Sequence, residues 1–201
     1  MGSKFRVKRI FRPMVVWIAK QFQKTKVTPN QVSIMGTILA IGGSIIFYFI
    51  YDYWGSLLFG IFIFFAGIFD GVDGTLARLT KRESILGGYY DSIMDRYADT
   101  IIMLSFLGHY SSLSSIIGVP CVVWVVFALM GTLLVSYTRA RAEAAGIKNC
   151  DVGLAARSER LFTLVIFSIL NYAYIGLVIL AIITHLTAIY RIYFVHRELK
   201  S

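Results

Sequence analysis

Residues 53–78 read YWGSLLFGIFIFFAGIFDGVDGTLAR, an uncharged run followed by two acids and an arginine. Its first 17 residues, 53–69, carry no charge, and Asp70 and Asp73 follow directly. A helix rises about 1.5 Å per residue, so a run of this length nearly crosses the hydrocarbon core of a bilayer. The stretch therefore predicts a transmembrane helix that carries acidic side chains at one end.

The composition of the whole chain agrees with a membrane protein. Of its 201 residues, 57% are hydrophobic and 15% are charged, and the mean hydropathy is +0.70. Soluble domains average about 25% charged residues, so a chain this short could not cover a water-facing surface, and water-soluble classes are excluded. The net charge of +9 is compatible with an anionic lipid surface, an anionic substrate or a topology signal.

Further uncharged runs complete the set of spans. Residues 32–51 form one run of 20. Residues 100–138 lack acidic and basic residues, which is too long for one crossing, and Gly108 and Pro120 mark a break. Residues 161–190 are interrupted near Asn171. We therefore expect an all-α integral membrane protein with six transmembrane helices, near 32–51, 53–69, 87–108, 119–143, 155–172 and 176–197.

The N-terminal segment has a different pattern. Between Lys4 and Lys26, basic residues alternate with apolar residues at helical spacing, namely Phe5, Ile10, Phe11, Met14, Val15, Ile18 and Phe22. Such a pattern predicts an amphipathic helix that lies in the membrane interface. We expect a juxtamembrane segment, 1–26, followed by one membrane domain, 27–201.

The basic residues predict the orientation. If the chain crosses the membrane six times, all 20 basic residues fall on one side, eight of them before the first span. The others form groups of four around the second connection, five around the fourth and three at the C-terminal end: Arg78, Lys81, Arg82 and Arg96; Arg139, Arg141, Lys148, Arg157 and Arg160; and Arg191, Arg197 and Lys200. Basic loops face the cytoplasm. The chain is therefore predicted to be a multi-pass protein of the cell membrane with both termini in the cytoplasm.

Acidic residues gather on two neighbouring spans. Asp70 and Asp73 are three residues apart, and Asp91 and Asp95 are four apart, so each pair lies on one helix face. A short turn brings the two pairs opposite each other. Charges at membrane depth are costly and usually mark function. Oxygen ligands without nearby His or Cys favour Mg²⁺ or Mn²⁺, and two such ions would cancel the four charges and could hold a pyrophosphate.

The spacing of these residues resembles the signature of the CDP-alcohol phosphotransferase family. The pattern reads Asp73-Gly74-x-x-Ala77-Arg78, with a leading Asp70, and continues with Gly87, Asp91 and Asp95. The resemblance covers nearly the whole chain and implies six transmembrane helices, an interfacial N-terminal helix and a homodimer. It also implies that Asp70, Asp73, Asp91 and Asp95 hold two divalent ions and that Asp95 is the general base.

The same resemblance implies the substrates. The residues expected to bind CDP are Asp70, Asp73, Gly74, Ala77, Arg78, Gly87 and Asn30. The family transfers a substituted phosphate from a CDP-alcohol, here a CDP-lipid such as CDP-archaeol or CDP-diacylglycerol, to an acceptor hydroxyl and releases CMP.

A second cluster, of arginines, lies at the predicted cytoplasmic ends of the last three spans. In one interpretation these arginines mark the cytoplasmic side and form salt bridges, such as that of Arg139 with Glu143 one turn further along. In the other they bind a phosphate group in bidentate fashion. These segments resemble those of phosphatidylinositol-phosphate and archaetidylinositol-phosphate synthases, whose acceptor is inositol 1-phosphate. The resemblance assigns the acceptor phosphate to Arg139, Arg157, Arg191 and Arg141. Bacterial members commonly have Lys at the position of Arg139 and an acid at that of Ala156.

Alternatives remain open. Glycerol 3-phosphate could be the acceptor, or CDP-inositol the donor for di-inositol phosphate synthesis. In a different class, paired acids serve ion-coupled transporters as proton or sodium relays. Asp99 lies outside the signature with Arg96 nearby, and we expect it to form a structural pair or a helix-dipole contact. No nucleic-acid partner is expected.

Overall fold

The computed structural model describes residues 7–110, 115–116, 118–147, 150 and 152–200. These residues form seven helices: α1 (Val7–Gln23), α2 (Pro29–Phe49), α3 (Tyr53–Thr80), α4 (Ile85–His109), α5 (Cys121–Ala144), α6 (Arg157–Ile169) and α7 (Ala173–Glu198). Between α4 and α5, where the sequence predicts a break, the strands β1 (Ser115–Ile116) and β2 (Val119–Pro120) pair antiparallel. The all-α fold class is therefore confirmed, with one short hairpin added.

Four helices are long and apolar enough to cross a membrane. Within the described residues these are α2, α3, α5 and α7. The other two predicted spans are helical but differ in character. Helix α4 carries the charges of Asp91, Asp95, Arg96 and Asp99, and α6 has only 13 residues. The helices themselves agree with the expected ranges, and the count of six crossings stays a prediction.

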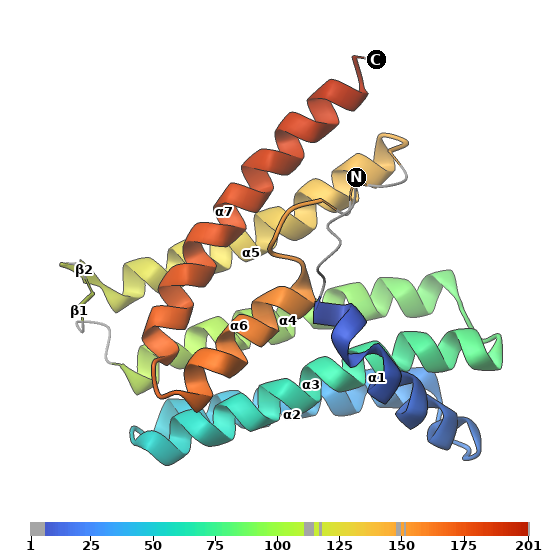
Figure 1. The fold of residues 1–201 in the computed structure, drawn as a ribbon, viewed down its shortest axis with the longest axis horizontal. Coiled ribbons are helices and arrows are strands. Elements are labelled where there is room, and N and C mark those ends of the chain that lie inside the picture. Colours follow the sequence, from blue (N-terminus) through green and yellow to red (C-terminus); the bar gives the residue numbers. More distant parts are fainter. Residues whose placement is uncertain (1–6, 111–114, 117, 148–149, 151, 201) are drawn as a thin grey trace.

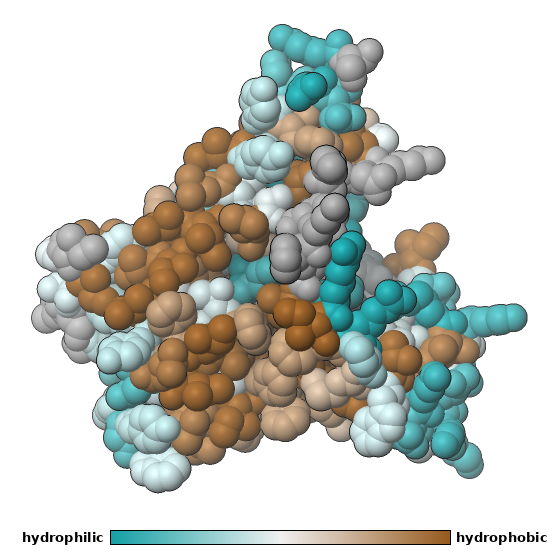
Figure 2. Space-filling model, viewed as in Figure 1, coloured by the Kyte–Doolittle hydropathy of each residue, from teal (hydrophilic) through white to brown (hydrophobic). Residues whose placement is uncertain are grey.

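The helices α2 to α7 run between two ends of the molecule (Figure 1). The α2–α3 turn, the β-hairpin and the α6–α7 turn lie at the left end of the view. Helix α1, the α3–α4 turn, the α5–α6 connection and the C-terminus lie toward the right and the top. Figure 2 shows hydrophilic residues gathered at the right and the top, with hydrophobic residues over the centre and left. The connections predicted to be cytoplasmic thus share one end, and the side of a membrane that it faces stays a prediction.

Polar caps fix where the helices of the site begin. Thr28 and Gln31 form a reciprocal capping box at the start of α2, with Pro29 in the first turn. The Ser84 hydroxyl accepts a hydrogen bond from a backbone amide in the first turn of α4. Helix α3 ends at Lys81, which adopts a left-handed conformation with φ of 54°. The chain therefore reverses within a few residues, and the acids of α3 and α4 face each other.

An aromatic stack joins α2, α3 and α4 at the end away from the acids. Phe47, Phe59 and Phe106 are fully buried. The Phe47 and Phe59 rings stack with centroids 4.4 Å apart, and Phe106 meets Phe47 edge-on at 5.0 Å. Each such pair contributes about 0.5–1.5 kcal/mol beyond its burial. The stack stabilises the relative placement of the three helices that meet at the acidic residues.

Helix α1 packs along α3. Its Val15 and Ala19 are buried in a cluster with Val72 of α3, and its basic side chains are exposed. Of the residues expected on its apolar face, Ile10 is 69% exposed, and Phe5 lies outside the described residues. The segment is thus helical with one packed face, whereas its position in a membrane interface stays a prediction.

The close approach of α2 to α3 leads to a first prediction. A Cβ atom added at Gly43 would lie 2.6 Å from the Cβ atom of Phe62, whereas one added at Gly42 would lie 3.5 Å from the Phe62 ring. We expect Gly43→Ala to lower the free energy of unfolding by about 1–3 kcal/mol through overpacking. Gly42→Ala should leave it unchanged or raise it by up to about 1 kcal/mol, because alanine favours a helix. Thermal unfolding in detergent micelles measures both, and equal stability would contradict the predicted difference.

Candidate active site

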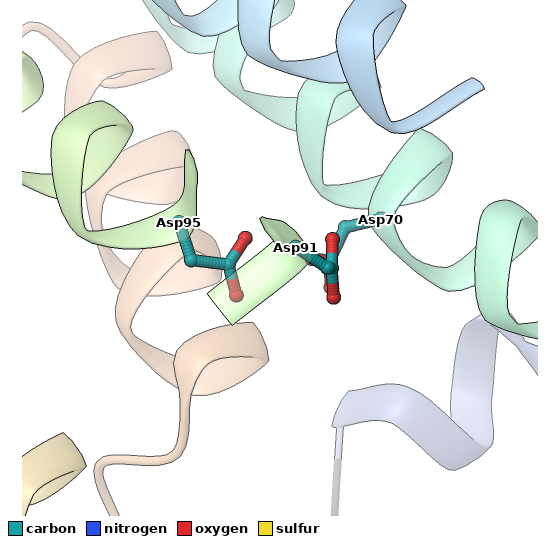
Figure 3. A group of neighbouring side chains, drawn as sticks. All are labelled: Asp70, Asp91 and Asp95. Atoms are coloured by element: carbon teal, nitrogen blue, oxygen red, sulfur yellow. The ribbon is translucent and has the colours of Figure 1, made fainter. Parts of the chain in front are cut away.

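Three of the predicted acids converge. Carboxylate oxygens of Asp70, Asp91 and Asp95 all lie within 4.8 Å of one another. Figure 3 shows Asp95 of α4 pointing toward the other two, with Asp70 coming from α3. All three side chains are partly buried. The prediction that acids from the two helices lie opposite each other is confirmed for this group.

The fourth acid, Asp73, is held separately. It is 6% exposed, and its Oδ2 accepts a hydrogen bond of 2.5 Å from the hydroxyl of Ser33 on α2. Its other oxygen accepts from the amide of Gly74. Asp73 is outside the group of three in this structure, and its role as a metal ligand stays a prediction. The sequence did not identify Ser33, although it lies three residues after Asn30 at the start of the same helix.

The group of three fits a hard divalent cation. Its donors are carboxylate oxygens alone, which suit Mg²⁺ or Mn²⁺. Ligand oxygens lie about 2.1 Å from Mg²⁺, so opposite ligands span about 4.2 Å, close to the separation within this group. The residues present are therefore able to bind such an ion after small side-chain adjustments.

An arginine contacts the same carboxylates. The Nη1 of Arg157, the first residue of α6, forms ion pairs with Asp70 and Asp95. Its Nε lies 3.6 Å from Asp99, and its side chain is 19% exposed. A buried carboxylate without a partner is costly. Arg157, expected to bind the acceptor phosphate, thus compensates part of the charge of Asp70 and Asp95 in this structure.

Asp99 forms a buried ion pair deeper in the molecule. Its Oδ2 lies 2.7 Å from Nη2 of Arg160, and both side chains are 4% exposed. The prediction that Asp99 forms a structural pair is confirmed, but with Arg160 and not with Arg96, which instead lies 3.7 Å from Asp95. Arg160 follows Arg157 by one helical turn, so α6 presents two guanidinium groups to the acids of α4.

The residues expected to bind CDP lie at the same end of α2, α3 and α4. A Cβ atom added at Gly87 would lie 3.6 Å from Oδ1 of Asn30, and one at Gly74 would lie 3.7 Å from Nη1 of Arg78. Gly74, Ala77 and Gly87 are all partly exposed. Small residues here leave room for a ligand to approach the backbone. The structure thus brings Asn30 close to Gly87 and Arg78 over Gly74, and their contact with CDP stays a prediction.

The other predicted phosphate ligands occupy different settings. Arg191 is 2% exposed and donates to backbone carbonyls of α5 and of the α5–α6 connection, at 2.5 and 3.0 Å. Arg139 and Arg141 are exposed. The Nε of Arg139 donates to Glu143 at 2.9 Å, which confirms the alternative of a local salt bridge. Binding of an acceptor phosphate by these three arginines stays a prediction.

Comparison with known proteins places the chain among phospholipid-synthesising enzymes. The family model described as CDP-alcohol phosphatidyltransferase matches residues 26–192. The archaetidylinositol phosphate synthase of Pyrococcus horikoshii is 33% identical over 185 residues, which cover 91% of each chain. The bifunctional IPC transferase and DIPP synthase of Aquifex aeolicus is 32% identical over 86% of this chain and 40% of the relative.

Solved structures show the same fold. The phosphatidylinositol phosphate synthase of Mycobacterium tuberculosis, with CDP-DAG bound, superposes with a TM-score of 0.74 and 24% identity, covering 91% of this chain and 94% of the other. The same protein in complex with manganese and citrate gives a TM-score of 0.72 and 23% identity, covering 90% and 88%. These similarities support the fold. The family match and the curated relatives exclude the alternative of an ion-coupled transporter.

The buried pair of Asp99 and Arg160 leads to a second prediction. Arg160→Met removes one partner and leaves a poorly compensated buried carboxylate, which should lower the free energy of unfolding by about 3 kcal/mol. The control Arg139→Met breaks the exposed pair with Glu143, with side chains 54% and 51% exposed, and should cost less than about 1 kcal/mol. Thermal unfolding in detergent measures the two changes. A similar loss in both variants would contradict a stabilising role for the buried pair.

Proposed function

The chain belongs to the CDP-alcohol phosphatidyltransferase family, and on this premise we propose that it transfers a substituted phosphate group from a CDP-lipid to inositol 1-phosphate. CMP is the second product, and the reaction belongs to phospholipid biosynthesis. The observation that carries the proposal is the convergence of Asp70, Asp91 and Asp95 within the family's spacing of acids. The 33% identity to an archaetidylinositol phosphate synthase over 91% of the chain supports the choice of acceptor.

Asp95 is proposed as the general base. Its carboxylate accepts the proton of the acceptor hydroxyl, whose oxygen then attacks the phosphorus next to the lipid alcohol, and the bond from that phosphorus to CMP breaks. Asp70, Asp73, Asp91 and Asp95 would hold two ions of Mg²⁺ or Mn²⁺. When bound, these ions neutralise the charge of the pyrophosphate and stabilise the leaving phosphate. The remaining contribution of the protein is to position the two substrates.

We propose that the CDP donor binds beside the starts of α2 and α4 and the small residues of α3. Asn30, Gly74, Ala77, Arg78 and Gly87 would surround the CDP group together with the acids. Arg78 supplies a positive charge beside Gly74, which suits a phosphate. The lipid part of the donor would extend along the apolar helix surfaces into the bilayer.

The acceptor site is proposed on the side of α6. Arg157 contacts Asp70 and Asp95, so its guanidinium lies next to the proposed general base. Arg139, Arg191 and Arg141 are proposed to complete the phosphate site. Guanidinium groups bind phosphate in bidentate fashion, which would favour an acceptor that carries a phosphate over free inositol.

The membrane arrangement follows the charge distribution. We propose a multi-pass protein of the cell membrane with six crossings, in which 1–26 forms the interfacial segment and 27–201 the catalytic domain. Both termini and the active site would face the cytoplasm, because the hydrophilic end of the molecule holds the basic connections. The family resemblance further suggests a homodimer.

A second candidate keeps the same chemistry but changes the donor. The relative named as a bifunctional IPC transferase and DIPP synthase is 32% identical over 86% of this chain. This likeness supports CDP-inositol as an alternative donor, with di-inositol phosphate as the product type. Glycerol 3-phosphate is the other acceptor that an arginine-lined site would suit.

The proposed reaction is tested with a panel of substrates. Purified protein with Mg²⁺ should release CMP only when a CDP-lipid and inositol 1-phosphate are both present. CMP release with glycerol 3-phosphate, or from CDP-inositol, would select one of the alternatives. Release with free inositol or serine in place of inositol 1-phosphate would contradict the proposed acceptor.

The role of Asp95 gives a separate prediction. Asp95→Asn keeps the shape of the side chain but removes the proton acceptor, so CMP release should fall at least about 100-fold. The matched control Glu83→Gln, on the exposed α3–α4 turn, should keep full activity. Size-exclusion profiles verify that both variants are folded. Activity that survives in a folded Asp95→Asn variant would show that another group takes the proton.

A further inference from the structure

Arg157 occupies the place at which the ions are expected. We propose that Arg157 is the internal counter-ion of the acids in the metal-free protein, and that it leaves them when divalent ions bind. Its guanidinium is then free for the phosphate of the acceptor. Metal binding would thereby assemble the acceptor site, and this last step rests on the proposed function.

The geometry makes the two cations competitors. The Nη1 of Arg157 contacts Asp70 and Asp95, and both belong to the group of three carboxylates. A divalent ion bound to this group would use the same oxygens. Two like charges at such a short separation also repel strongly in an environment of low dielectric constant. Arg157 therefore cannot keep these contacts while the group binds an ion.

The charges balance differently in the two states. Without ions, Arg157 provides one positive charge to Asp70 and Asp95, with Asp91 close by. With two divalent ions, the four proposed ligands, Asp70, Asp73, Asp91 and Asp95, are neutralised without the arginine. The guanidinium then carries a charge that lacks a local partner, and burial of such a charge is costly. An anionic group such as a phosphate would restore the balance.

The neighbouring contacts allow Arg157 to move. Asp99 keeps its ion pair with Arg160 at 2.7 Å, and Arg160 is anchored further by a hydrogen bond of 3.1 Å to the carbonyl of Ala155. Asp99 is therefore still compensated after Arg157 leaves. The Nε of Arg157 makes no hydrogen bond, so its side chain is held mainly by the carboxylates with which the ions would compete.

The experiment measures Mn²⁺ binding to the full-length protein without substrates, by calorimetry. Arg157→Gln removes the competing charge, so it should bind Mn²⁺ at least about fivefold more tightly than the wild type, the lower range for coupled sites. Arg82→Gln removes the same charge from the exposed α3–α4 turn and should leave the affinity unchanged. Arg157→Met serves if the Gln variant does not fold, because it keeps the apolar part of the side chain and removes the same charge from Asp70 and Asp95, and it should also bind Mn²⁺ more tightly.

A second titration tests the link to the acceptor. Inositol 1-phosphate should bind the wild type in the presence of Mn²⁺ at least about fivefold more tightly than in its absence. Equal or weaker Mn²⁺ affinity in the Arg157 variants would overturn the inference and leave the proposed function standing. Equal binding of inositol 1-phosphate with and without Mn²⁺ would likewise overturn the inference without contradicting the proposed function. A wild type that does not bind Mn²⁺ would contradict the proposed function itself.

Discussion

The compensation of carboxylates between apolar helices is the constraint on which the rest of the site depends. Helices α3 and α4 place five acids close together, and a charge taken out of water is costly unless another charge compensates it. Helix α6 meets this requirement with Arg157 and Arg160, one turn apart. Helix α6 thus compensates these charges and also packs with Leu161, Leu164 and Val165 in the hydrophobic core.

The separations within the site depend on how closely the helices pack. At Gly36 of α2, an added Cβ atom would lie 3.2 Å from the Cβ atom of Phe69 and 3.8 Å from the amide of Asp70. Contact at this point brings α2 to the first acid, and the bond from Ser33 to Asp73 lies one turn away on α2. The aromatic stack around Phe47 fixes the same helices at their other end. The close contact at Gly36 near the site and the aromatic stack at the other end thus together fix the placement of α2 against α3.

Two of the expected spans, α4 and α6, carry several of the charged groups of the site and are less apolar than α2, α3, α5 and α7. Four expected spans, α2, α3, α5 and α7, each contain an apolar stretch long enough to cross a membrane. Helix α4 carries Asp91, Asp95 and Asp99, and α6 begins with charged residues and is short. Their hydropathy is lowered by the charged groups that meet at the candidate site.

The sequence by itself determined the helical segments and the placement of each acid pair on one face of its helix, because uncharged runs and spacings of three or four residues are local properties. Only the tertiary structure decided which charged and polar groups pair. Arg160 and Asp99 are 61 positions apart, Arg157 and Asp70 are 87 apart, and Ser33 and Asp73 are 40 apart. Such pairings arise when packed helices exclude water and each charge takes the nearest partner, which no local periodicity specifies. For the same reason, the placement of Arg157 on the acids became visible only in the folded molecule.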